Sequence, residues 1–156
     1  MMVQSSAGGA LNMESALVRV LVVDDFLPFR SFICATLSQN SNLRVIGEVS
    51  DGQEAVDKAR ELVPDLILLD IGLPTLNGIE AAREIRKHVP ESKILFVSQE
   101  SSPEVVEEAV SVRNCGYVVK TKAGSDLLVA VDAVLAGGQF VSRAGWSSSA
   151  QAADYR

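Results

Sequence analysis

Four short apolar runs in this 156-residue sequence are each followed by a side chain that could bind a metal ion or a phosphate group. These side chains are Asp24 and Asp25 after residues 18–23, Asp70 after 66–69, Ser98 after 94–97 and Lys120 after 117–119. If the runs are parallel strands spaced about 4.8 Å apart, their carboxyl ends lie along one edge of a sheet, where α/β proteins bind ligands. The acidic, hydroxyl and amino groups would then share one pocket.

This set of groups suits a pocket for phosphate and magnesium. Three clustered carboxylates repel one another and raise one another's pKa unless a cation neutralises them. Mg²⁺ is a suitable cation because it binds a few carboxylates together with water and phosphate oxygens. Lys120 and Ser98 supply a positive charge and a hydroxyl for phosphoryl oxygens. Each residue alone has a structural explanation, such as helix capping by Asp25. Their occurrence at four strand ends favours the pocket.

The rest of the sequence predicts the elements that would position these residues. The apolar runs are short, rich in β-branched residues and bounded by turn residues, which predicts strands at 18–23, 43–49, 66–69, 94–97 and 117–119. The second run alternates and contains Arg44 and Glu48, which is typical of a sheet edge. Apolar residues at helical spacing follow each strand, and they predict a first helix from about Pro28 to Ser38. One side of that helix comprises Phe29, Phe32, Ile33 and Leu37.

Five such βα units predict an α/β fold with one doubly wound parallel sheet and helices on both faces. Residues 1–17 are small and polar, which predicts a flexible leader. The folded domain is expected to span residues 18–137. Residues 138–156 are rich in Gly, Ser and Ala, which is typical of a linker or a disordered tail.

Composition excludes several classes of protein. The chain has 14 Lys and Arg against 20 Asp and Glu, and this acidic balance argues against direct nucleic-acid binding. No apolar run reaches the ~18 residues of a membrane span, and the N-terminus lacks the features of a secretion signal. Two cysteines, Cys34 and Cys115, form no disulfide framework and suit a cytoplasmic protein.

Several segments closely resemble the receiver domain of bacterial two-component response regulators, in the branch usually fused to a LuxR-type helix-turn-helix. The matching segments are Val20–Arg30 (VLVVDDFLPFR), Leu66–Gly78 (LILLDIGLPTLNG), Ile94–Ser98 (ILFVS) and Gly116–Lys120 (GYVVK). The resemblance covers about residues 18–137. It implies a flavodoxin-like (βα)₅ sheet with strand order 2-1-3-4-5.

The resemblance also implies roles for the residues of the pocket. Asp70 corresponds to the aspartate that accepts a phosphoryl group, and Lys120 to the family's lysine. Asp24 and Asp25 correspond to the acidic pair, and Mg²⁺ is expected on this pair, on Asp70 and on the backbone carbonyl of Gly72. Phosphoryl uptake would depend directly on Asp70, Lys120 and Ser98, so the chain is expected to be a signalling domain rather than an enzyme acting on an external substrate.

A conformational switch is the second implication of the resemblance. Ser98 and Tyr117 match the two switch residues, whose movement changes a surface that binds other proteins. The partners implied are a sensor histidine kinase or phosphotransfer protein and an unidentified downstream protein, with a second copy of the chain as a further candidate. Two positions depart from the pattern. Gln99 stands where the family has a small residue, and Asn114 stands in the turn before the fifth strand, where it can replace glycine in a left-handed conformation.

Two alternatives within the same fold stay open. One is a receiver-shaped interaction module that works without phosphorylation, and the other is a piece of a DNA-binding transcriptional regulator. A haloacid-dehalogenase-type phosphatase needs two aspartates separated by one residue, whereas Asp24 and Asp25 are adjacent. A flavodoxin-like FMN binder is disfavoured because this acidic pair would repel the flavin phosphate.

Overall fold

The computed structural model describes residues 17–142 of the chain. Its strands are β1 (Val18–Val23), β2 (Leu43–Val49), β3 (Leu66–Leu69), β4 (Lys93–Ser98) and β5 (Cys115–Val119). Its helices are α2 (Leu27–Leu37), α3 (Gly52–Leu62), α4 (Gly78–His88), α5 (Pro103–Val110), the short 3₁₀ helix η1 (Lys120–Lys122) and α6 (Ala123–Leu135). Residues 1–16 of the predicted leader and residues 143–156 of the predicted tail lie outside the described residues.

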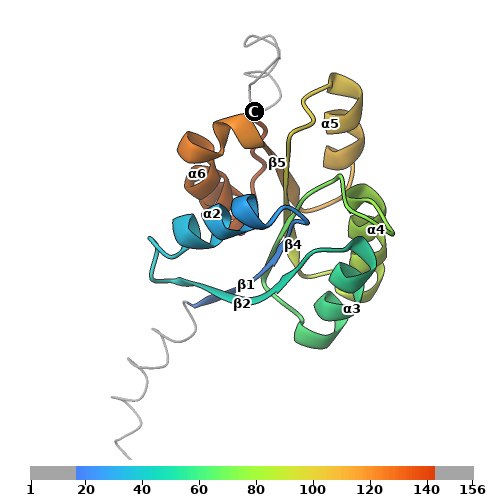
Figure 1. The fold of residues 1–156 in the computed structure, drawn as a ribbon, viewed down its shortest axis with the longest axis horizontal. Coiled ribbons are helices and arrows are strands. Elements are labelled where there is room, and N and C mark those ends of the chain that lie inside the picture. The colour runs from blue at the N-terminus through green and yellow to red at the C-terminus, as the bar shows by residue number, and fades with distance from the viewer. Residues whose placement is uncertain (1–16, 143–156) are drawn as a thin grey trace, which may run out of the picture.

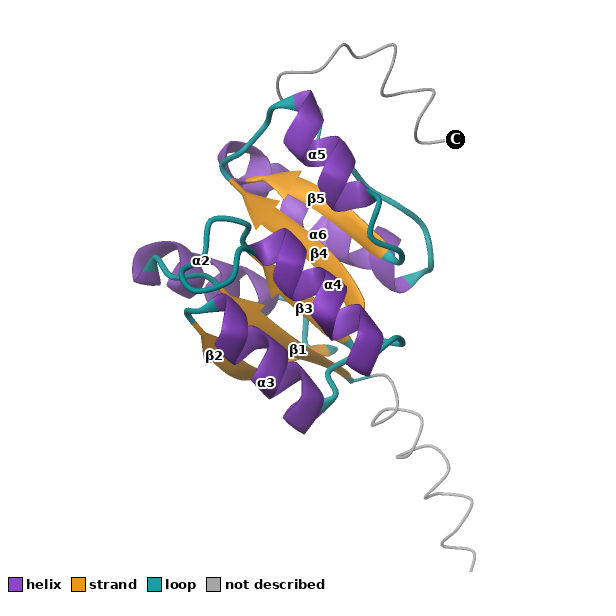
Figure 2. Cartoon of the chain, turned by 90° about the vertical axis from the view of Figure 1, so that its right-hand side faces the viewer, coloured by secondary structure: helices purple, strands orange, loops and turns teal. Residues whose placement is uncertain are grey.

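Within residues 17–142, five parallel strands form one sheet in the order β2-β1-β3-β4-β5. Helices α3, α4 and α5 cover one face, and α2 and α6 cover the other (Figures 1 and 2). The α/β class and the predicted strand order are confirmed. Among the described residues, no helix is long and apolar enough to cross a membrane.

Alternating side chains of the central strands build two separate cores, one on each face of the sheet. On β1, Val20 and Val22 pack toward α2 and α6, whereas Leu21 and Val23 pack toward α3 and α4. All four residues of β3 are fully buried, as expected for a strand covered on both faces. β2 is an edge strand with Arg44 and Glu48 exposed, which confirms its predicted place.

The four residues predicted on one side of the first helix are not equally buried. Ile33 and Leu37 of α2 are fully buried, but Phe32 is 40% exposed. Phe32 lies one position before Ile33, so its side chain is rotated by about 100° around the helix axis toward solvent. Phe29 is half-buried, and its ring contacts that of Phe32 at a centroid distance of 5.3 Å.

The fifth strand begins two residues earlier than the sequence predicted. Asn114 precedes it with φ of +56°, which confirms that asparagine takes the left-handed conformation in this turn. The turn lets Cys115 and Gly116 pair with Ile94 and Leu95 of β4. The apolar run at 117–119 therefore marked only the second part of the strand.

The folded structure also extends beyond Gly137, the predicted domain end. The backbone N–H of Tyr117 donates to the carbonyl of Phe140 at 2.7 Å, and the N–H of Ser142 donates to the carbonyl of Tyr117 at 2.8 Å. The Ser142 hydroxyl accepts from the Val119 N–H and donates to Asp126, each at 3.0 Å. These bonds and the buried side chain of Val141 attach residues 140–142 to β5.

The loop between β3 and α4 is held in one shape by close contacts. The Thr75 hydroxyl donates to Asp51 at 2.6 Å, although Thr75 itself has φ of +71°. The N–H of Gly78 donates to the carbonyl of Ile71 at 2.7 Å. A Cβ added at Gly78 would lie 2.0 Å from the carbonyl oxygen of Asp70. Glycine at position 78 is therefore required for the loop to close on the end of β3.

We expect Gly78→Ala to lower the free energy of unfolding by about 1–3 kcal/mol, because the added methyl must displace backbone atoms. Chemical denaturation measures this change. Gly124→Ala is the matched control, since no other described atom lies within 4 Å of its Cβ position. Alanine within α6 should leave the free energy of unfolding unchanged or raise it slightly. Equal effects of the two substitutions would contradict the close approach at Gly78.

Candidate functional site

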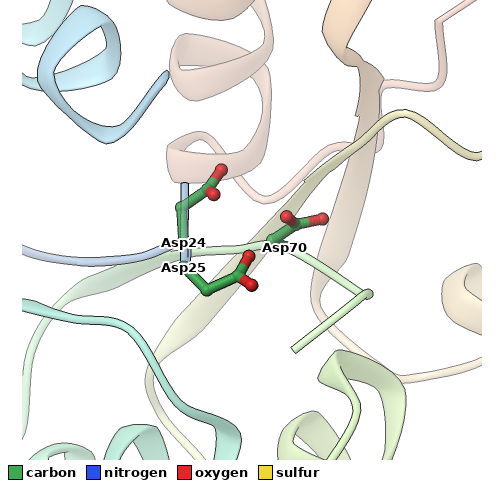
Figure 3. Close-up of side chains that lie close together, drawn as sticks. All are labelled: Asp24, Asp25 and Asp70. Atoms are coloured by element: carbon green, nitrogen blue, oxygen red, sulfur yellow. The ribbon is translucent and has the colours of Figure 1, made fainter. Parts of the chain in front are cut away.

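Three carboxylates meet where β1 and β3 end. Val23 pairs with Leu69, so Asp24, Asp25 and Asp70 follow neighbouring strands at the same level of the sheet. Each carboxylate offers an oxygen within 4.8 Å of the other two (Figure 3). Asp24 and Asp70 are buried and Asp25 is exposed. The structure thus brings together the acidic residues that the sequence placed in one pocket.

Local hydrogen bonds set the direction of the acidic pair. Asp24 accepts the backbone N–H of Phe26 at 2.8 Å. The carbonyl of Asp24 accepts from Arg30 at 2.7 Å, and Arg30 forms an ion pair with Glu48 of β2 at 3.1 Å. Among the described residues no side chain caps α2, so Asp25 does not have the capping role considered as its alternative. Arg30 gives no signal of this role in the sequence, because its link to Glu48 exists only in the folded chain.

Lys120 lies between two of the carboxylates. Its ammonium is 2.8 Å from Asp24 and 3.1 Å from Asp70, and only 14% of its side chain is exposed. Burial lowers the pKa of Lys120, but the hydrogen bonds and charges of Asp24 and Asp70 outweigh burial and raise that pKa above its ordinary value. Lys120 is therefore a buried cation that partly neutralises the cluster.

The Asp70 carboxylate is poised at the centre of the site. One of its oxygens accepts the N–H of Ile71 at 2.7 Å and the other is paired with Lys120. Burial raises the pKa of Asp70, Lys120 lowers it and the charge of Asp24 raises it, with a net upward shift. The remaining excess of negative charge suits a further cation.

A cavity of about 610 Å³ opens beside Asp70. Its wall comprises Asp25, Phe26, Phe29, Asp70, Gly72, Ser98, Gln99, Glu100 and Lys120. Apart from Gly72 and its two chain neighbours, no described residue has an atom within 4 Å of the position a Cβ would take on Gly72, so there is room beside its backbone. Carboxylate and backbone carbonyl oxygens are ligands that Mg²⁺ prefers, so the carboxylates and Gly72 in the wall fit this ion. Gln99 lines the cavity and is exposed, so its side chain would narrow the path of a phosphoryl group to Asp70.

The two predicted switch residues meet through Glu100. Ser98 is buried, and its hydroxyl accepts the N–H of Glu100 at 3.2 Å. Tyr117 is fully buried beside Phe96, and its hydroxyl donates to the carbonyl of Glu100 at 2.8 Å. Burial raises the pKa of Tyr117 to about 12, although a hydrogen bond with Ser98 acts in the opposite direction. In this structure Tyr117 therefore points inward, next to the end of β4.

Comparison with known proteins decides the family. Residues 20–132 match the family described as the response regulator receiver domain. The chain belongs to the response regulator receiver family. This receiver domain is 37% identical over 114 residues to the response regulator protein VraR of Staphylococcus aureus, covering 73% of this chain and 54% of VraR. The chain spans about half the length of the curated relatives it matches.

Solved structures agree with this assignment. A two-component response regulator of the LuxR family from Aurantimonas sp. SI85-9A1 has a TM-score of 0.75 and 29% identity, covering 80% of this chain and 89% of that chain. The response regulator domain of Thermotoga maritima CheB has a TM-score of 0.70 and 30% identity, covering 77% of this chain and 97% of that chain. The similarity to receiver domains therefore extends over the whole sheet.

We expect Asp70→Asn to make the metal-free receiver domain more stable at neutral pH. Because the folded protein raises the pKa of Asp70, this carboxyl contributes stability below its ordinary pKa of 3.8 and loses that contribution as the pH rises through the raised value. The advantage of the asparagine variant should accordingly shrink as the pH falls. Urea denaturation in the presence of EDTA, repeated across the acidic and neutral range, measures the difference.

Asp132→Asn on the exposed side of α6 is the matched control, and it should change the free energy of unfolding by less than about 0.5 kcal/mol. An Asp70→Asn variant less stable than the wild type at pH 7 would show that pairing with Lys120 outweighs the cost of burial.

Proposed function

We propose that this receiver domain accepts a phosphoryl group on Asp70 from a phosphohistidine of a sensor kinase or phosphotransfer protein. The observation that carries the proposal is the position of Asp70, a partly neutralised carboxylate that faces an open cavity and is paired with Lys120. Of the side chains lining the cavity, Asp70 alone combines burial, pairing with a cation and access to the opening. Membership of the receiver family is established, whereas phosphorylation of Asp70 and the roles of the other site residues are our proposal.

Phosphoryl uptake would use the groups already in place. An Asp70 oxygen attacks phosphorus while the bond from phosphorus to the histidine nitrogen breaks, and the bonding pair leaves with the imidazole. The Lys120 ammonium follows the developing negative charge on the phosphoryl oxygens. Asp24 keeps Lys120 in position through its 2.8 Å contact. Later hydrolysis of the aspartyl phosphate by water resets the domain, so the chain acts as a signalling domain that modifies only itself.

Asp24, Asp25, Asp70 and the Gly72 carbonyl would hold Mg²⁺, which when bound neutralises charge on the phosphoryl oxygens. The supporting observations are the three carboxylates with oxygens within 4.8 Å of one another and the room beside Gly72. Burial, and to a smaller extent the charge of Asp24, raise the pKa of Asp70, so a bound cation would also stabilise this buried carboxylate.

The switch would run from Ser98 to the surface formed by α5, β5 and α6. The Ser98 hydroxyl, which accepts the N–H of Glu100, would donate its proton to a phosphoryl oxygen and turn toward it. The backbone of Glu100 also receives the Tyr117 hydroxyl bond, so a shift of Ser98 changes the contact that holds Tyr117 inward. This surface would then exist in two conformations. Phosphorylation would favour one of them, and the downstream protein would bind that conformation.

Location and partners follow from the same proposal. A domain that receives phosphoryl groups from a sensor kinase works in the cytoplasm. Residues 17–142 would recognise the kinase and the downstream protein through protein–protein contacts. The relatives described above are VraR, a response regulator protein, and a two-component response regulator of the LuxR family. DNA binding would belong to a further domain of such a regulator rather than to the sheet and helices described here.

Phosphoryl uptake from phosphoramidate with Mg²⁺ tests the chemistry. Intact-mass measurement should show one added phosphoryl group on the wild type and none on Asp70→Asn. Lys120→Gln should slow uptake about a hundredfold, because it removes the cation that faces the phosphoryl oxygens. Asp57→Asn, an exposed carboxylate of α3, is the matched control and should behave as the wild type. Uptake that persists in Asp70→Asn would reject Asp70 as the acceptor.

The proposed switch predicts a pattern of amide NMR shifts on titration with Mg²⁺ and then beryllofluoride, a phosphoryl mimic. Shifts should begin at Asp25, Asp70 and Lys120 and reach Ser98, Tyr117 and α5, with the beryllofluoride response absent from Asp70→Asn. A response to Mg²⁺ but not to beryllofluoride would favour the module that works without phosphorylation. No response to either would overturn both the metal site and the phosphoryl site.

A further inference from the structure

The Lys120 ammonium contacts an aromatic ring in addition to its two carboxylate partners. Two directions lead to Asp24 and Asp70, at 2.8 and 3.1 Å. The ring of Phe29 lies on another side, with its centroid 4.5 Å from the Lys120 nitrogen. We propose that Phe29 is a positioning residue, whose aromatic face holds the Lys120 ammonium over the cavity for phosphoryl capture. The inference rests on the proposed function of Lys120 and assigns a further residue to the same site.

The geometry is that of a cation–π contact in a place sheltered from water. A distance of 4.5 Å is within the ~6 Å at which the negative face of a ring attracts a cation. Because only 14% of the Lys120 side chain is exposed, water screens this attraction little. Phe29 also lines the cavity beside Asp70, so it borders the space in which the phosphoryl group would sit.

The chain segment that supplies the acidic pair also supplies the ring. Phe29 lies in the first turn of α2, and its N–H donates to the carbonyl of Phe26 at 3.1 Å. The same segment is fixed by the bond from Arg30 to the carbonyl of Asp24. The ring and the Asp24 carboxylate are therefore placed together, and both hold the ammonium that comes from the end of β5.

An aromatic face suits a lysine that must change partners. During phosphoryl uptake, negative charge moves from the Asp70 carboxylate to the phosphoryl oxygens, and the ammonium must follow it. Unlike a carboxylate, a ring attracts the cation without fixing the direction of a hydrogen bond. The N–H groups of Lys120 can therefore turn from Asp70 toward the phosphoryl oxygens. A third carboxylate in the same place would compete with the phosphoryl oxygens. A smaller apolar side chain would let the flexible lysine stem swing into solvent.

A packing role for Phe29 gives a different expectation. The ring also contacts Phe32 at 5.3 Å, and simple packing would be preserved by any change that keeps its size and shape. Stepwise fluorination of the ring nearly preserves size but weakens the negative face. The response to fluorination therefore separates attraction of the cation from packing.

The test replaces Phe29 with phenylalanine analogues carrying an increasing number of ring fluorines in the otherwise unchanged chain. Beryllofluoride affinity in Mg²⁺ and the rate of phosphoryl uptake from phosphoramidate should fall stepwise, by about three- to thirtyfold over the series. The same analogues at Phe32 are the matched control, because that ring neighbours Phe29 and is 40% exposed. They should leave both quantities unchanged. In Lys120→Gln the residual uptake should no longer respond to fluorination at position 29, since the cation is gone.

A second measurement keeps the inference testable if phosphoryl uptake is absent. The pKa of Lys120, followed by NMR of its side-chain nitrogen, should fall stepwise as fluorination weakens the stabilisation of the ammonium. A wild type that takes up no phosphoryl group, together with this fall, would reject the proposed function and retain the contact with Phe29. If uptake and the pKa of Lys120 both stay constant across the Phe29 series, the ring only packs and the inference is overturned.

Discussion

The structure depends on one electrostatic constraint, which is the accumulation of carboxylates at the ends of two adjacent strands. Asp24 and Asp70 are both buried there, and burial of like charges is unfavourable without a cation. Lys120 supplies that cation from the end of β5, across β3 and β4 in the sheet. The ion pairs therefore join the first, third and fifth strands at the edge where the cavity opens. They leave a residual negative charge that a further cation can neutralise.

The surrounding loops restrict how this charged cluster can relax. Arg30 ties the carbonyl of Asp24 to Glu48 on β2, and the contact of Gly78 with the carbonyl of Asp70 closes the loop after β3. Because both loops are anchored to neighbouring elements, the carboxylates cannot simply move apart to reduce their repulsion. The carboxylates therefore stay close together beside the cavity, where a bound cation would reduce their mutual repulsion.

Strand β5 connects the cavity with residues 140–142. Tyr117 donates through its hydroxyl to Glu100 near the cavity, and its backbone N–H and carbonyl pair with Phe140 and Ser142. A change at Ser98 therefore has a short covalent and hydrogen-bonded route to residue 142. This route runs through β5, the strand that also ends in Lys120.

Local pattern in the sequence was sufficient to predict the strands, the α/β class and the residues that gather at the cavity. Apolar runs interrupted at Asp24, Asp70, Ser98 and Lys120 report burial and strand ends directly, because they arise from neighbours along the chain. Tertiary structure alone decided the contact of Lys120 with Phe29, the bond between Arg30 and the Asp24 carbonyl and the pairing of residues 140–142 with β5. These contacts join segments through backbone groups, ring faces and side-chain direction, which leave no periodicity in the sequence. The exposure of Phe32 was also not evident from the sequence, since spacing along a helix identifies a face only to within about one residue.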